Sequence, residues 1–272
     1  MLKKILIIVD SIDMEDSSGS KANVALINNL HKGGFEVLVY HYTRKKVILK
    51  NIDTFEISEI KFSVLYFLSR LERVFTRATK ISLNPYLESW FGFSFTFFND
   101  TQSIKKALKK EIRNNYDLVL TLSKGASFKP HYAILDIPEL HDKWMAYVHD
   151  PYPFHFYPRP YNWIQPGFRQ KERFFVQVSE KAKFSAFPSF LLKEWMCSYF
   201  PNFLKTGIVI PHQSAEYNIQ KQDLPSYFDT SKFNLLHAGN LMKQRSPEGL
   251  IEGFKLFLDK NPEARGVSRL ML

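Results

Sequence analysis

Short apolar runs alternate with amphipathic segments along most of this chain. Residues 3–9 (KKILIIV) are apolar and rich in β-branched side chains, which is typical of a strand buried inside a parallel sheet. A helix follows, with Ala25, Leu26 and Leu30 on one face, and we expect Ser20 to cap its start. Glycines 33 and 34 end this helix, and residues 35–42 form the next strand. This βαβ unit predicts a parallel sheet with a right-handed crossover.

The same alternation continues to about residue 212. Further strands are predicted at residues 116–122, 144–148, 184–187 and 206–210. Helices are predicted from Asp100 to about residue 115 and from Ser189 to about residue 199. Strands that alternate with helices in this way indicate a doubly wound, Rossmann-like α/β domain over residues 1–212.

The pattern restarts after a polar stretch, residues 213–232, which we interpret as a linker between domains. Residues 233–238 (FNLLHA) predict a strand, and Ser246 and Pro247 begin a helix with a favoured N-terminal pair. The helix has an apolar face that we expect to be buried, formed by Leu250, Ile251, Phe254, Phe257 and Leu258. Residues 233–272 therefore indicate the start of a second Rossmann-like domain. One βα unit and a strand cannot bury their own faces, so we expect this domain to be incomplete.

Aromatic side chains make up 15% of the chain and gather in two segments. Residues 62–77 predict a helix with apolar residues on one side and Arg70, Arg73 and Arg77 nearby. Residues 90–98 alternate phenylalanine with small residues, as in an edge strand. One interpretation is a membrane-facing surface or a groove for a lipid acceptor. The other is packing of a helix and an edge element against the first domain.

Charge and composition limit the function further. The net charge of +10 suggests an anionic partner, but no recognised motif indicates nucleic-acid binding, so we expect no nucleic-acid partner. The single cysteine excludes an intramolecular disulfide, and the apolar run near the N-terminus is shorter than a signal peptide requires. We therefore expect a cytoplasmic protein, with a peripheral contact at the inner face of a membrane as a further option. The GxGxxG and Walker motifs are missing from the sequence, which argues against a plain dehydrogenase or NTPase.

Ligands of open α/β sheets bind beyond the carboxyl ends of the strands, and this rule selects several loops of the first domain. The loop after the first strand carries Ser18, Gly19 and Ser20 at a helix start, where an anion or a sugar hydroxyl can bind. Lys124 and Gly125 follow a second strand. His149 and Asp150 follow a third, and they are the candidate catalytic residues because they can hydrogen-bond or orient a reacting sugar. His155 lies close by in sequence, but its spacing matches no strong metal motif, so we expect no metal site.

A second candidate site follows the strand at 233–238. Gly239 frees the backbone there, Asn240 follows it, and Lys243 and Arg245 bring two cations to the start of the next helix. Cations and a helix N-terminus together favour a ligand with several negative charges. We expect these four residues to bind a diphosphate.

Residues 233–254 (FNLLHAGNLMKQRSPEGLIEGF) resemble the opening of the donor domain in retaining GT-B glycosyltransferases of family four. Gly239, Leu241 and Phe254 match the family pattern, and Arg245 stands where the family has Lys. Asn240 replaces a family Arg, which weakens the implied grip on the diphosphate. Residues 208–213 (IVIPHQ) are similar to the family's VIPNG at the end of the first domain.

The resemblance implies transfer of a sugar from a nucleotide-diphosphate sugar to a hydroxyl of a glycan or lipid-linked glycan acceptor. It also implies retention of anomeric configuration and no cofactor. The family reads its donor through two Glu residues eight positions apart late in the donor domain, and residues 1–272 end before that point. We therefore expect the chain as given to be inactive alone. A non-catalytic module that binds an acceptor or a membrane surface is the alternative.

Overall fold

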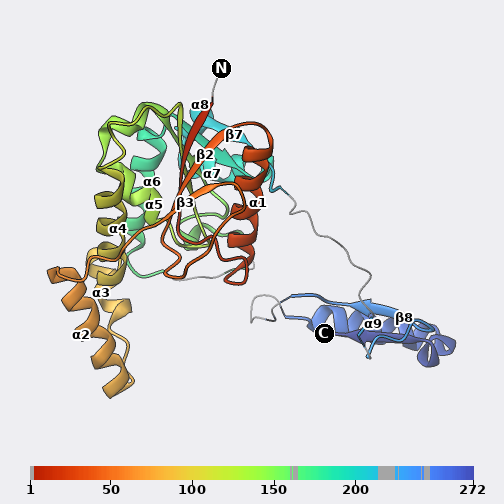
Figure 1. Ribbon diagram of the computed structural model, residues 1–272. Helices are drawn as coiled ribbons and strands as arrows, with labels where there is room; N and C mark the ends of the chain where they lie inside the picture. Colours follow the sequence, from red (N-terminus) through yellow and green to blue (C-terminus); the bar gives the residue numbers. More distant parts are fainter. Residues whose placement is uncertain are drawn as a thin grey trace. The chain divides into compact units, whose positions relative to one another are not determined.

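The computed structural model describes residues 3–159, 161, 165–213, 224–225, 227–239, 241 and 246–272 (Figure 1). The chain divides into two compact units, residues 1–216 and 217–272, and each is described by itself. The assignment of residues 1–212, 213–232 and 233–272 as domain, linker and incomplete donor domain stays a prediction. Among the described residues, no helix combines the length and apolar character needed to cross a bilayer.

A parallel sheet forms the centre of the first unit. Its strand order is β3-β2-β1-β4-β5-β6-β7, and every neighbouring pair is parallel. The strands are β1 (Lys4–Val9), β2 (Glu36–His41), β3 (Asp53–Glu56), β4 (Leu118–Leu122), β5 (Trp144–Tyr147), β6 (Phe184–Phe187) and β7 (Gly207–Val209). Because the order reverses direction at β1 and β4, their carboxyl ends mark the switch point where such sheets bind ligands.

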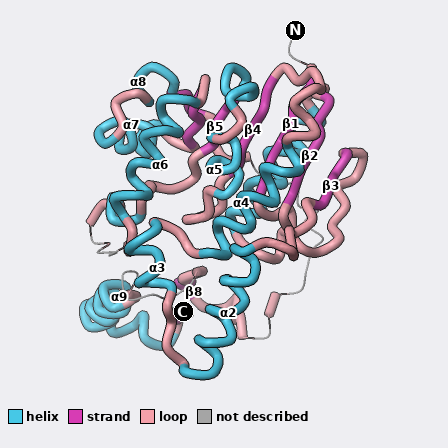
Figure 2. Tube along the Cα trace, turned by 90° about the vertical axis from the view of Figure 1, so that its left-hand side faces the viewer, coloured by secondary structure: helices cyan, strands magenta, loops and turns pink. Residues whose placement is uncertain are grey.

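Helices cover both faces of this sheet. They are α1 (Ser18–Lys32), α2 (Val64–Thr79), α3 (Asn84–Phe91), α4 (Phe95–Leu108), α5 (Lys129–Leu135), α6 (Phe168–Lys181), α7 (Phe190–Tyr199) and α8 (Phe203–Thr206). Figure 1 shows α1 on one side of the sheet and α4, α5 and α6 on the other, and Figure 2 looks onto that second side. The predicted doubly wound α/β fold is confirmed.

The pleat of the central strand explains the two apolar cores. Along β1, Ile5, Ile7 and Val9 pack toward α1, whereas Leu6 and Ile8 pack toward α4 and α5. Successive side chains of a strand point to opposite faces, so a strand with helices on both sides must be apolar at every position. This is why residues 3–9 read as one continuous apolar run.

The second unit is a single βαβ motif. Strand β8 (Phe233–Leu236) pairs in parallel with β9 (Ser268–Met271), and α9 (Glu248–Lys260) and a 3-10 turn (Pro262–Gly266) connect them. The expectation that the apolar face of α9 is buried is wrong in this structure. Leu250, Phe254 and Leu258 are half-buried, and Ile251 and Phe257 are exposed, because two strands offer too little surface to cover them.

Several local predictions also need correction. Ser17, not Ser20, caps α1, because its extended backbone lets Oγ accept the Ser20 N–H. Helix α4 begins at Phe95 and not at Asp100, because the Ser94 hydroxyl caps it. Residues 95–98 are therefore helical, and the predicted edge strand at 90–98 is wrong. Strand β3 and helices α5 and α6 were not predicted.

Candidate functional site

One pocket gathers loops from the carboxyl ends of β1, β4, β5 and β7. Its volume is about 440 Å³, and it is lined by Ser17, Ser18, Gly19, Ala22, Lys124, Gly125, His149, Asp150 and His212. Of the seven residues predicted for the first-domain site, only Ser20 does not line it. The strand-end rule thus located one shared cavity from loops that are far apart in sequence.

The start of α1 forms one wall of the pocket. Ser17 Oγ accepts the Ser20 N–H at 3.1 Å, so the helix begins at Ser18, and Ser18 and Gly19 occupy its first turn. The N–H groups of a first helical turn have no partner inside the helix, and the helix dipole adds positive potential. Ser20 is fully buried, with its hydroxyl 3.1 Å from Ser17 Oγ. Ser20 therefore supports the loop and does not face a ligand.

A tight turn after β4 forms the second wall. Lys124 and Ser127 exchange two backbone hydrogen bonds of 3.0 and 2.9 Å, and Gly125 has φ +55° inside the turn. Gly125 is suited to this left-handed conformation, which a β-carbon would strain. The Lys124 Nζ donates to Asp16, and this bond is the main reason that the pKa of Asp16 is lowered. Lys124 therefore lies at the pocket with its charge already partly balanced.

His149 is held by protein groups at both ring nitrogens. Its Nε2 lies 2.7 Å from Asn23 Oδ1, and its Nδ1 lies 2.8 Å from His212 Nε2. The Asn23 Nδ2 donates to the carbonyl of Ser123 at 3.0 Å, which turns Oδ1 toward the histidine. Oδ1 can only accept, so Nε2 of His149 carries the proton and Nδ1 accepts from His212. The Ser123 Oγ also accepts the His149 backbone N–H at 3.1 Å.

Burial keeps His149 uncharged. Desolvation, with a smaller contribution from His212, lowers the pKa of His149 to about 3. Desolvation also lowers the pKa of His212, against an opposing effect of Asp150. With its ring neutral and both nitrogens engaged, His149 has no free lone pair for a substrate proton. This arrangement fits a residue that positions the strand-end loops better than one that acts as a general base.

Asp150 remains the acidic side chain that lines the pocket. It follows His149 at the end of β5 and is half-buried. Pro151 comes directly after it and restricts the backbone on leaving the strand. Its carboxylate can accept hydrogen bonds from the hydroxyls of a sugar or an acceptor.

Sequence reasoning missed the residues that fix His149. Asn23 lies on the buried face of α1 and is fully enclosed, and Ser123 is also buried. A lone amide among the apolar residues 24–27 was the available signal, because buried polar groups require partners. Its partner lies 126 residues away, which no local pattern reveals.

The second candidate site is described only at Gly239. Gly239 is exposed in the loop after β8. Asn240, Lys243 and Arg245 lie outside the described residues, so their role in binding a diphosphate stays a prediction. In the part of the chain that the structure describes, no three His, Cys, Asp or Glu side chains cluster as a metal site would require.

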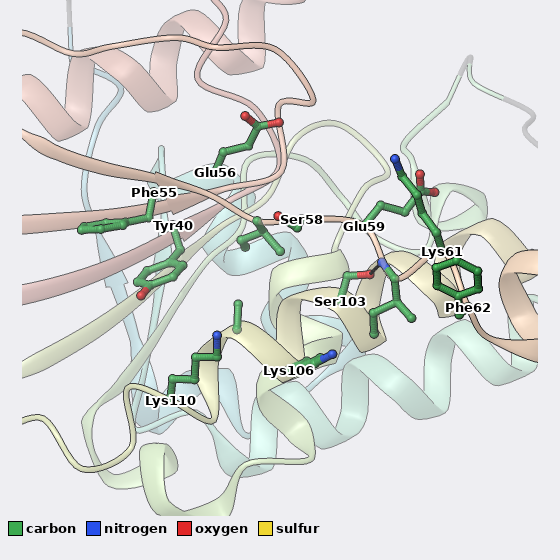
Figure 3. Close-up of a pocket in the computed structure, with 13 residues that line it drawn as sticks. Tyr40, Phe55, Glu56, Ser58, Glu59, Lys61, Phe62, Ser103, Lys106 and Lys110 are labelled. Atoms are coloured by element: carbon green, nitrogen blue, oxygen red, sulfur yellow. Dashed lines mark hydrogen bonds between the residues drawn. The ribbon is translucent and has the colours of Figure 1, made fainter.

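A larger cavity, of about 630 Å³, lies away from these loops and contains none of the predicted residues. It opens between the edge strand β3, the segment that follows it, and α4 (Figure 3). Tyr40 and Phe55 stack there with ring centroids 5.4 Å apart, and Lys106 and Lys110 line the wall formed by α4. We assign it no role in the predicted chemistry.

Comparison with known proteins was informative at the level of structure alone. No protein family matches the sequence, and no curated protein does so either. An α,α-trehalose-phosphate synthase (UDP-forming) from Burkholderia vietnamiensis matches 100% of this chain, at 11% identity and a TM-score of 0.57. Anabaena Alr3699/HepE, solved in complex with UDP and glucose, matches 99% of it, at 13% identity and a TM-score of 0.52.

The chain spans 64% of the first of these structures and 60% of the second. At such identities the likeness concerns the fold. The chain has an α/β Rossmann-like fold that matches GT-B glycosyltransferase structures. The narrower assignment to family four stays a prediction.

Proposed function

We propose that this chain supplies the acceptor-side half of a glycosyltransferase. The enzyme would move a sugar from a nucleotide-diphosphate sugar to a hydroxyl of a glycan or lipid-linked glycan, with retention of configuration and without a cofactor. The observation that carries this proposal is the pocket at the carboxyl edge of the sheet, where the start of α1, the 124–127 turn, Asp150 and His212 meet. The shared fold supports it, as does the resemblance of residues 233–254 to a donor-domain opening.

The chemistry gives each wall of the pocket a role. The bond between the sugar carbon and the diphosphate oxygen breaks, and the acceptor oxygen forms the new bond to that carbon. The departing diphosphate gains negative charge and takes up the proton that the acceptor hydroxyl loses. The first turn of α1 at Ser18 and Gly19 would stabilise that charge. Lys124 would add to it, Asp150 would orient hydroxyls, and His149 would hold the loops in register.

Arg245, Lys243 and Asn240, with Gly239, would complete the grip on the diphosphate from the second unit. This part of the proposal rests on the sequence resemblance. We also propose a cytoplasmic location, because the chain has one cysteine and that residue is buried and free.

Gly19 offers a direct test. A β-carbon at Gly19 would lie 3.4 Å from Lys124 Cγ, so alanine fits, whereas the larger side chain of Gly19→Leu would enter the pocket. We expect Gly19→Leu to weaken binding of the nucleoside diphosphate by on the order of a hundredfold, and Gly19→Ala to retain most of it. Titration calorimetry with UDP, GDP, ADP and CDP on the product of the whole reading frame measures this. Equal affinities for Gly19→Leu and the wild type would remove the pocket from the proposal.

The alternative is a non-catalytic module that binds an acceptor or a membrane surface. The exposed helical surface treated below favours a membrane contact, which an enzyme can also have. A chain that binds none of the four nucleoside diphosphates, yet binds vesicles, would favour the module.

A further inference from the structure

Helix α2 presents its apolar side chains to solvent. Its apolar positions follow the i, i+3, i+4, i+7 spacing of a single helix face. That face is exposed, with relative accessibilities of 75% for Val64, 61% for Phe67, 50% for Leu71, 62% for Val74 and 40% for Phe75. A surface helix of a globular protein normally turns such a face inward, so this exposed face requires an explanation.

Polar contacts fix α2 in this orientation. Ser69 and Glu72 are its buried residues, and α2 packs on α4. Arg73 donates to the Thr96 hydroxyl at 3.2 Å, and the cap residue Ser63 donates to Asn99 Oδ1 at 2.7 Å. The polar side of the helix is therefore the side that faces the protein. The apolar side is free.

Helix α3 extends the exposed apolar surface. Tyr86 and Trp90 are four residues apart, share one face of α3, and are 69% and 78% exposed. Phe62, just before α2, is also fully exposed. Figures 1 and 2 both show α2 and α3 at the same end of the first unit, projecting beyond the sheet. We call the exposed apolar residues of segment 62–91 the α2–α3 surface.

Positive charge flanks this surface. Arg70, Arg77 and Lys80 are exposed on or next to α2, and the acid of this helix, Glu72, is buried. Arg70 stacks over the Tyr66 ring at 4.6 Å, which keeps its cation beside the apolar face. The other acid of the segment, Glu88, is paired with Lys171 at 2.6 Å. A partner of this surface must therefore be apolar in its interior and negative at its rim.

We propose that the α2–α3 surface docks on an anionic lipid bilayer, with its apolar residues in the headgroup boundary and its cations against lipid phosphates. Helices with apolar residues on one face and Lys or Arg beside them bind membranes in this way, and Trp and Tyr favour the interface. A second copy of this chain is a poorer partner, because it would bring two rows of arginine together. The inference does not depend on the proposed transfer chemistry.

Vesicle co-sedimentation tests the proposal with matched variants. Wild-type chain is mixed with vesicles of phosphatidylglycerol and phosphatidylcholine in equal parts, and with vesicles of phosphatidylcholine alone. Phe67→Ser/Leu71→Ser removes two residues of the surface without a change in charge. Phe190→Ser/Leu191→Ser removes the same residue types from α7, where they are 71% and 79% exposed. Arg77→Gln/Lys80→Gln is compared with Lys181→Gln/Lys183→Gln, which removes two charges elsewhere.

We expect binding to the anionic vesicles, with on the order of hundredfold weaker binding for Phe67→Ser/Leu71→Ser. Arg77→Gln/Lys80→Gln should weaken binding by about thirtyfold, at about fivefold for each cation. Both α6–α7 controls should bind as the wild type does. All replaced residues are exposed, and circular dichroism confirms the fold.

Failure of the wild type to bind anionic vesicles would overturn the proposal, as would equal binding to neutral vesicles. Unchanged binding of Phe67→Ser/Leu71→Ser would also overturn it. If the wild type instead self-associates in the ultracentrifuge and this variant does not, the surface is a contact between copies. Loss of nucleoside-diphosphate binding alone would bear on the proposed function and leave this inference intact.

Discussion

At the scale of single residues, the ring of His149 gives the clearest physical signature of the candidate site. Its two hydrogen bonds and its burial favour the neutral form, with a pKa of about 3 against about 6.5 in an unfolded chain. Between these two values the unfolded state binds a proton that the folded state does not. The free energy of unfolding therefore falls as the pH drops below about 6.5.

We predict that His149→Asn makes the stability less sensitive to acid. One depressed histidine contributes about 1.4 kcal/mol per pH unit to the slope, so the slope between about pH 6 and pH 5 should decrease by that amount. Urea unfolding at several pH values measures it. The difference near pH 8 gives the variant's own structural cost, since histidine is neutral there in both states. An unchanged slope would show that His149 titrates normally in the folded protein.

At the scale of elements, the junction between α3 and α4 decides the meaning of the phenylalanine-rich segment. Phe93 and Phe97 are buried and stack with ring centroids 4.0 Å apart. Phe93 also packs edge-on against Tyr132 of α5 and Phe174 of α6. Phe91 is 50% exposed. The segment thus serves both predicted purposes, since its inner rings form core and its outer rings face solvent.

We predict that Phe93→Ala lowers the free energy of unfolding by about 3–5 kcal/mol, because it opens a cavity among packed rings. Phe91→Ala, two residues away, should cost below about 1 kcal/mol, because an exposed ring leaves no cavity. Urea unfolding of both variants measures the contrast. Similar costs would contradict the packing described for this junction.

The sequence predicted the buried strands well and the exposed elements poorly. Residues 3–9 and 116–122 are apolar because helices cover both faces of their strands, and no other element of that length suits them. Strand β3 was missed because it lies at the sheet edge, where only Thr54 is even half-buried. Helix α4 was started too late because alternating phenylalanines imitate a strand, whereas Ser94 as a cap was the better signal. The site loops followed from strand order, but Asn23 could not, because its partner comes from a distant part of the chain.

At the scale of the whole molecule, the two units differ in how far they bury their own apolar side chains. The first unit has apolar cores on both faces of its sheet, whereas no residue of α9 is fully buried. Phe233, Leu235, Leu250, Phe254 and Phe257 line an apolar pocket of the second unit. The candidate catalytic pocket lies entirely within the first unit, and the predicted diphosphate residues lie in the second. Transfer would therefore depend on both.

The most direct test of the central claim is sugar transfer by the protein expressed from its whole reading frame. Release of nucleoside diphosphate is measured with UDP-, GDP-, ADP- and CDP-sugars, with and without a mixture of glycan and lipid-linked acceptors. We predict acceptor-dependent release from one class of donor, lowered on the order of a hundredfold by Asp150→Asn. Absence of release with every donor, or full activity of Asp150→Asn, would contradict the account.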